Sequence, residues 1–185
     1  IVTHTADLIR AHAFRITKVS PERIRDELLK LLEVPNATAA LRCLDDLELL
    51  CYFIPELAQA KNVTQPKEHH WDVFNHMLET AGQVEAVISG SASYSSFATD
   101  IVPKFQDMNE YFREEVSDGH SRLTLIKLTG LIHDIAKPAT KSVDSSGRVR
   151  FLGHHTEGAD VSDRILKRLR FSSRGMELVR LMVQN

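Results

Sequence analysis

An adjacent histidine and aspartate, His133 and Asp134, stand at the end of an apolar run that begins near Leu128. An imidazole and a carboxylate are costly to bury among leucines and isoleucines unless they are paired or bind a metal. A divalent cation accepts both types of ligand at once. Because Pro138 disfavours helical angles at the residue before it, the pair is predicted to lie in the last turn of a buried helix.

Two further histidines are candidates to join this pair. His76 lies beside the apolar face of a helix predicted between Trp71 and Ile88, and His154 opens a later helix. A divalent metal with such ligands and open positions suits hydrolysis, because the water it binds becomes acidic enough to supply hydroxide near neutral pH. Asp134 is also placed to bridge two metals, which would clamp the attacking and leaving oxygens of a phosphate ester.

Each of these residues also has an ordinary structural interpretation. A His-Asp dipeptide occurs by chance in many chains, and it can equally be a hydrogen-bonded core pair or a charged histidine at a helix C-terminus. His154 can simply begin its helix. Lys137 follows the pair either as a contact for phosphate or as a solvated lysine after a helix. The occurrence of the candidates on separate elements favours the metal site.

Three cations, Lys141, Arg148 and Arg150, lie on a β-hairpin predicted between Ala139 and Leu152. They are candidates for weak contacts with phosphate or RNA, and a solvated hairpin face is the alternative. The whole chain has 23 Lys plus Arg against 25 Asp plus Glu and a net charge of −2. It therefore lacks a global basic field for nucleic acid, so any RNA contact must be local.

The elements that must position these residues are mostly amphipathic helices. At 185 residues the chain fits one domain, or one domain with a small appendage. The spacing of apolar residues, with Ser, Asn and Pro at the starts and stops, predicts helices over parts of 3–14 and over 20–35, 36–50, 71–88, 101–116, 121–134, 154–169 and 172–182. The fold class is therefore mostly α, a helical bundle with one small β-hairpin, preceded by a short helical neck.

Cysteine usage and hydropathy indicate a cytoplasmic protein without a membrane partner. Cys43 and Cys51 lie in leucine-rich surroundings and are interpreted as buried thiols rather than a redox or zinc motif. No apolar run approaches the ~18 residues of a membrane span, and no signal peptide opens the chain. The chain opens with Ile1 and closes on Asn185, and both ends are expected to be cuts in a longer protein.

A family resemblance rests on the blocks His69 to His76, Leu131 to Pro138 and Arg150 to His154. They resemble the HD superfamily of metal-dependent phosphohydrolases. Their order, with the hairpin between them, resembles the HD domain attached to bacterial tRNA nucleotidyltransferases (CCA-adding enzymes) and poly(A) polymerases. Upstream, Ser20 to Leu28 and Ile54 to Leu57 resemble the helical segment that joins the catalytic head to the HD domain in those enzymes.

The resemblance implies that a divalent metal, among Mn, Mg, Ni, Co, Fe and Zn, is held by His76, His133, Asp134 and His154. Asp134 and Lys137 would be the catalytic residues, Asp134 by orienting water and Lys137 by contacting phosphate. The implied activity is hydrolysis of phosphate mono- or diesters, including nucleotides, within a parent protein that processes tRNA or other RNA. A further His and a final Asp of the larger metal set would come later, so the HD domain is expected to be truncated at its C-terminus.

The resemblance also divides the chain into an RNA-binding-like neck at 1–66 and an HD domain at 67–185. Nucleotidyltransferase heads carry a Gly-Gly or Gly-Ser turn followed by paired aspartates on a strand. Here Asp45 and Asp46 instead lie in an amphipathic helix, so this chain alone should not add nucleotides to RNA.

A rival expectation is a non-catalytic module that supports RNA held by the absent head. In that case Lys141, Arg148 and Arg150 would matter more than His154. A stand-alone nucleotide phosphohydrolase is a third possibility, but it leaves the neck without a use.

Overall fold

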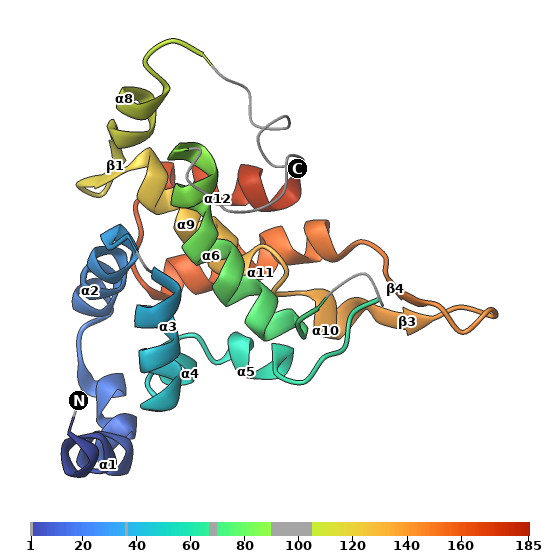
Figure 1. Ribbon diagram of the computed structural model, residues 1–185, viewed down its shortest axis with the longest axis horizontal. Helices are drawn as coiled ribbons and strands as arrows, with labels where there is room; N and C mark the ends of the chain where they lie inside the picture. Colours follow the sequence, from blue (N-terminus) through green and yellow to red (C-terminus); the bar gives the residue numbers. More distant parts are fainter. Residues whose placement is uncertain (1, 36, 67–69, 90–104) are drawn as a thin grey trace.

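The computed structural model describes residues 2–35, 37–66, 70–89 and 105–185, and there the chain is mostly helical, as predicted (Figure 1). The helices in chain order are α1 Thr3–His12, the 3-10 helix η1 Ala13–Lys18, α2 Pro21–Glu33, α3 Ala37–Asp46, α4 Leu50–Phe53, α5 Glu56–Ala60, α6 Val73–Ser89, α8 Met108–Arg113, α9 Arg122–Ile132, α10 Lys137–Thr140, α11 His154–Arg168 and α12 Ser173–Gln184.

Two short antiparallel strand pairs accompany the helices in the described ranges. The predicted hairpin is confirmed as β3 Lys141–Val143 and β4 Val149–Phe151, and it projects away from the helices (Figure 1). The pair β1 Glu115–Ser117 and β2 His120–Ser121 was not predicted. It lies where the helix assigned to 101–116 was expected to end, because Asp118 and Gly119 take φ values of 56° and 77° and turn the chain back as a hairpin. Residues 101–104 of that prediction lie outside the described ranges.

The neck departs from the prediction at its second helix. The helix expected over 36–50 ends at Asp46, and a new short helix begins at Leu50. Glu48 between them has a φ of 60°, a left-handed angle that an α-helix cannot continue through. Asn36, the expected N-cap, lies outside the described residues. Ser20 has the extended angles of an N-cap, although its side chain makes no capping hydrogen bond.

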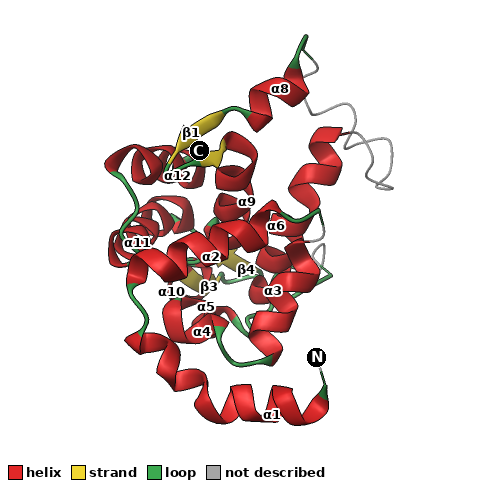
Figure 2. Ribbon diagram, turned by 90° about the vertical axis from the view of Figure 1, so that its left-hand side faces the viewer, coloured by secondary structure: helices red, strands yellow, loops and turns green. Residues whose placement is uncertain are grey.

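The helices α6 and α9 cross at the centre of the molecule, and the neck packs against them (Figures 1 and 2). One hydrophobic core runs from Leu29 of α2 through Leu41 of α3 and Met77 of α6 to Leu128 of α9. At the other end of this assembly, α1 has no buried residue. The neck helices α2 and α3 are therefore integral to the bundle rather than loosely attached.

The central helix α9 is buried on almost every side, and six of its eleven residues are Leu or Ile, although Thr124, Lys127 and Thr129 are buried with them. The predicted N-cap is confirmed, since the Ser121 side chain accepts a hydrogen bond from the Thr124 N–H. Among the described residues, we find no helix whose length and hydropathy would carry it across a lipid bilayer. Burial of α9 is instead a consequence of packing against α6, α2 and α12.

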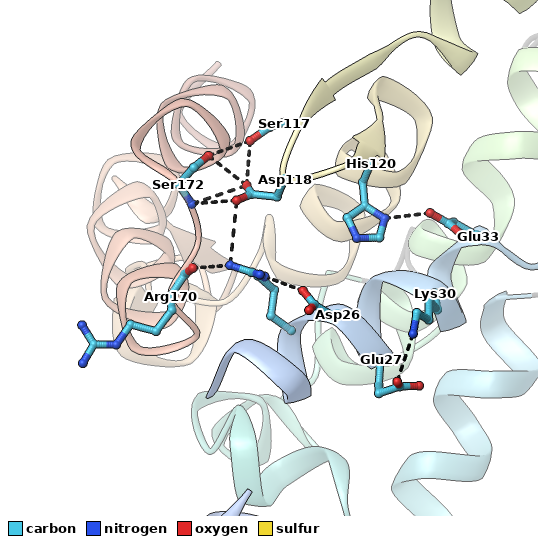
Figure 3. Close-up of polar contacts among 10 residues, drawn as sticks. Asp26, Glu27, Lys30, Glu33, Ser117, Asp118, His120, Arg170 and Ser172 are labelled. Carbon is cyan, nitrogen blue, oxygen red and sulfur yellow. Dashed lines mark hydrogen bonds and ion pairs between the residues drawn. The ribbon is translucent and has the colours of Figure 1, made fainter. Parts of the chain in front are cut away.

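Polar side chains connect α2 with the β1–β2 turn and with the segment between α11 and α12 (Figure 3). Asp118 accepts hydrogen bonds from the N–H of Ser172 at 3.1 Å and from its Oγ at 2.9 Å. Arg25 of α2 lies 3.8 Å from the Asp118 carboxylate and donates to the carbonyl of Arg170. Burial raises the pKa of Asp118, but the hydrogen bonds from Ser117 and Ser172 and the Arg25 charge outweigh burial and hold that pKa below its usual value.

Candidate metal centre

The His-Asp pair follows α9 rather than lying within its last turn. α9 ends at Ile132, His133 is its C-cap, and Asp134 belongs to the turn that leads into α10. The turn is closed by a hydrogen bond from the N–H of Lys137 to the Asp134 carbonyl at 3.0 Å. Pro138 does not simply stop a helix, since it occupies the first turn of α10, where a missing N–H is tolerated. The result is a carboxylate that is only 3% exposed.

All four residues expected to bind metal meet at this carboxylate. Nε2 of His76, from α6, lies 3.4 Å from Asp134 Oδ2, and Nε2 of His133 lies 3.1 Å from the same oxygen. Nε2 of His154, the first residue of α11, lies 3.6 Å from Oδ1. The ligand atoms of His76, His133 and Asp134 are all within 4.8 Å of one another. His154 therefore faces the second oxygen, outside this compact group.

Backbone carbonyls orient the imidazoles of His133 and His154. Nδ1 of His133 donates to the carbonyl of Gly130 at 2.9 Å, and Nδ1 of His154 donates to the carbonyl of Phe151 at 2.6 Å. Since a carbonyl only accepts, Nδ1 carries the proton in both rings, and in the neutral ring Nε2 has a lone pair directed at the carboxylate. Two acceptors facing each other require a proton or a cation between them. A histidine that binds metal through Nε2 typically donates its Nδ1–H to a backbone carbonyl in this way.

Lys137 is buried against the same carboxylate. Its Nζ lies 2.6 Å from Asp134 Oδ2, donates to Gln65 Oε1 at 2.7 Å, and lies 5.4 Å from the centre of the Phe151 ring. With only 8% exposure, it is not the solvated lysine of the alternative interpretation. Burial raises the pKa of Asp134, but His133 and Lys137 outweigh burial and hold that pKa well below its usual range.

The residues present fit a divalent cation. Oδ2 of Asp134 is buried and makes no hydrogen bond of regular geometry, although the Lys137 ammonium is close enough for an ion pair. Two imidazole nitrogens face that oxygen, and an N, N, O donor set suits a first-row divalent metal. The HD-type arrangement of His, His and Asp is therefore present in three dimensions.

A cleft of about 490 Å³ opens beside the carboxylate on the side of His154. Its remaining lining comes from His155, from the last turn of α12 and from Asn185, which follows that helix. The sequence pointed to three of its lining residues, His133, Asp134 and His154, but not to His155 or to the end of the chain. Gln65 was also missed, because its contact with Lys137 joins residues 72 positions apart and has no local signal.

The three hairpin cations do not all lie on one face of the hairpin. In the β3–β4 register, Lys141 pairs with Phe151 and Ser142 pairs with Arg150, so Lys141 and Arg150 lie on opposite faces of the hairpin. Lys141 Nζ donates to Thr64 Oγ1 at 2.9 Å. Nε of Arg150 lies 3.0 Å from Asp144 Oδ2. Arg148 is exposed, and it shares a face with Arg150.

Comparison with known families and proteins identifies two regions of the chain. The family described as HD domain matches residues 73–185, and the family described as "Probable RNA and SrmB- binding site of polymerase A" matches residues 1–61. The chain is similar to an A-adding tRNA nucleotidyltransferase of Deinococcus radiodurans, with 32% identity over 80% of this chain. It is also similar to a CC-adding tRNA nucleotidyltransferase of Thermus thermophilus, with 28% identity over 88% of this chain.

A different kind of relative matches nearly the full chain. A bifunctional uridylyltransferase/uridylyl-removing enzyme of Bradyrhizobium diazoefficiens is 24% identical over 99% of this chain. The chain spans only 27% and 31% of the length of the two tRNA nucleotidyltransferases and 17% of this third relative. The matched region is thus a minor part of each of these proteins.

Proposed function

The chain belongs to the HD domain family, of the type found in tRNA nucleotidyltransferases, and from that membership we propose that it is a metal-dependent phosphohydrolase. The proposed substrates are phosphate mono- or diesters, including nucleotides. The observation that carries the proposal is the buried Asp134 carboxylate. Three histidines from separate elements direct their Nε2 atoms toward its oxygens. We place the protein in the cytoplasm, where tRNA is processed.

The contacts suggest a separate role for each of these residues. His76, His133 and Asp134 would hold the cation, with His154 on the second carboxylate oxygen. A divalent cation supplies Lewis-acid polarisation of a phosphoryl oxygen and lowers the pKa of bound water. Asp134 can orient water through an oxygen that faces the cleft, and the Lys137 ammonium lies close enough to meet a phosphate oxygen.

Two further observations support phosphate-ester hydrolysis. The cleft beside His154 is about 490 Å³, large enough for a nucleotide-sized ligand. One relative is a bifunctional uridylyltransferase/uridylyl-removing enzyme, and removal of a uridylyl group is compatible with hydrolysis of a phosphate ester. Both favour a hydrolytic site over a purely structural histidine cluster.

The proposal is tested with protein stripped of metal and reloaded with Mn, Ni or Co. It should hydrolyse cyclic or linear nucleotide phosphates, and His133→Ala and Asp134→Ala should each remove both activity and stoichiometric metal. An unchanged hydrolysis rate in either variant refutes the assignment. Nucleotide addition to RNA is not expected from this chain alone.

The matched RNA-binding family at the N-terminal end favours a second candidate function. Residues 1–66 would be an RNA-facing neck and 67–185 an HD domain that supports tRNA or another RNA in a longer protein, with Arg148 and Arg150 as weak contacts. Salt-sensitive tRNA binding together with substoichiometric metal would favour this module. Tightly bound metal without RNA affinity would favour the hydrolase.

A further inference from the structure

One side chain of residues 61–66, the linker that follows α5, reaches the candidate metal centre. This linker runs alongside α10 toward the base of the β3–β4 hairpin (Figure 1). From it, Gln65 Oε1 accepts a hydrogen bond from Lys137 Nζ at 2.7 Å, while the same Nζ lies 2.6 Å from Asp134 Oδ2. The ammonium is therefore held at two points, of which only the carboxylate is a proposed metal ligand.

The orientation of the Gln65 amide is set by a second hydrogen bond. Its Nε2 donates to the carbonyl of Trp71 at 3.3 Å, which leaves Oε1 to face Lys137. The two ends of the amide thus have different partners, one a carbonyl and the other an ammonium. Rotation of the amide by half a turn would break both bonds.

The backbone that carries Gln65 is anchored on both sides. Lys61 Nζ lies 2.5 Å from Asp45 Oδ1 in α3, on the neck side. Toward the bundle, the N–H of Asn62 donates to Asp72 Oδ2 at 2.8 Å, and the N–H of Val73 donates to the Val63 carbonyl at 3.0 Å. The position of Gln65 is consequently determined by α3 and by the start of α6 together.

A divalent cation and the ammonium compete for the same oxygen. The Oδ2 that His76 and His133 face is also the oxygen paired with Lys137. A divalent cation held by His76, His133 and Asp134 would be repelled by the Lys137 ammonium, because this site is shielded from water. When a cation takes Oδ2, Gln65 Oε1 is a neutral acceptor that can keep the ammonium beside the site.

We propose that Gln65 is a positioning residue for the metal centre. Its carbonyl oxygen gives the Lys137 ammonium a second acceptor beside Asp134. The ammonium could therefore give up the carboxylate to a divalent cation and still stay next to the site, where a phosphate oxygen would arrive. This inference rests on the proposed metal-dependent function. It makes the end of the neck, residues 61–66, part of the site.

The test is a double-mutant cycle read out as Mn²⁺ affinity by titration calorimetry of metal-stripped protein. Gln65→Met, which keeps the length and removes the acceptor, should weaken Mn²⁺ binding about ten- to a hundredfold, as expected for one hydrogen bond to a charged group. Lys137→Met should tighten binding, because the competing cation is gone. In the Lys137→Met background, Gln65→Met should have no further effect.

Two other variants separate positioning from general damage to the fold. Thr64→Ala removes the neighbouring bond to Lys141, which does not touch the carboxylate, and should leave Mn²⁺ affinity unchanged. Gln65→Glu retains an acceptor for the ammonium and should keep Mn²⁺ affinity at or above the wild-type value. With an active preparation, Gln65→Met should raise KM for a nucleotide phosphate more than it lowers kcat.

The outcomes distinguish this inference from the proposed function. An equal loss of Mn²⁺ affinity for Gln65→Met with and without Lys137 overturns the positioning role, because a structural effect would not depend on the lysine. If the double-mutant cycle gives the expected Mn²⁺ affinities but no variant hydrolyses phosphate esters, Gln65 remains a positioning residue and the hydrolase proposal is refuted. Wild-type protein that binds no stoichiometric Mn²⁺ would overturn both.

Discussion

His154 Nε2 lies 3.6 Å from Oδ1 of Asp134, on the carboxyl oxygen opposite to the one that faces His76 and His133. We expect the three histidines to contribute unequally to binding of a single cation. His76→Ala and His133→Ala should lower metal affinity by about 100-fold or more, whereas His154→Ala should cost less than about tenfold. Metal content after dialysis at graded free Mn²⁺ measures this order, and an equal loss in all three variants would contradict it.

Asp118 makes the stability of the protein dependent on acid pH. Its pKa is lower in the folded chain than in the unfolded one, so its contribution is present above the unfolded pKa of about 4 and is lost as pH falls through the folded value. Asp118→Asn should therefore reduce the free energy of unfolding at pH 7 by about 1 kcal/mol. Urea unfolding at pH 7 and pH 3 should show that the difference in unfolding free energy between wild type and Asp118→Asn is smaller at pH 3. A larger difference at pH 3 would be evidence against this account.

Lys127 of α9 is completely buried, and its Nζ lies 2.6 Å from Glu85 Oε2 and 3.1 Å from the Val34 carbonyl. Lys127→Met should cost about 1–3 kcal/mol of unfolding free energy, because a helix-end carbonyl and a partly buried carboxylate lose their donor. The exposed pair Lys30–Glu27 provides the matched control, and Lys30→Met should cost at most about 0.5 kcal/mol. Equal costs for the two variants would show that burial is irrelevant here.

Gly82 of α6 permits close contact with α3. A Cβ at this position would lie 1.7 Å from Thr38 Oγ1 and 2.9 Å from the Thr38 backbone nitrogen. Although alanine favours a helix over glycine by about 1 kcal/mol, Gly82→Ala should destabilise the protein by a net of about 1–3 kcal/mol. Gly158→Ala, where the nearest atom is a Val183 side-chain carbon at 3.3 Å, should be milder in the same chemical denaturation assay.

Local sequence was sufficient for most of the helices and for the chemistry at their ends. Ser121 and Ser172 both cap the helices that they were expected to cap, because an N-cap depends only on residues within one turn. The turn around Gly147, with a φ of 80°, likewise marks the β3–β4 hairpin by itself. The presence of His76, His133 and Asp134 as metal-site candidates came from residue type and from the resemblance to the HD family.

Only the tertiary structure decided which atoms meet. The residues near Lys137 in sequence do not determine whether its side chain is solvated or contacts Asp134. Packing of α10 against residues 61–66 buries it. The same packing selects Gln65 as its partner and places His154 on the second carboxylate oxygen. Contacts between residues 20 to 72 positions apart depend on how whole helices pack, and neither hydrophobic periodicity nor capping carries that information.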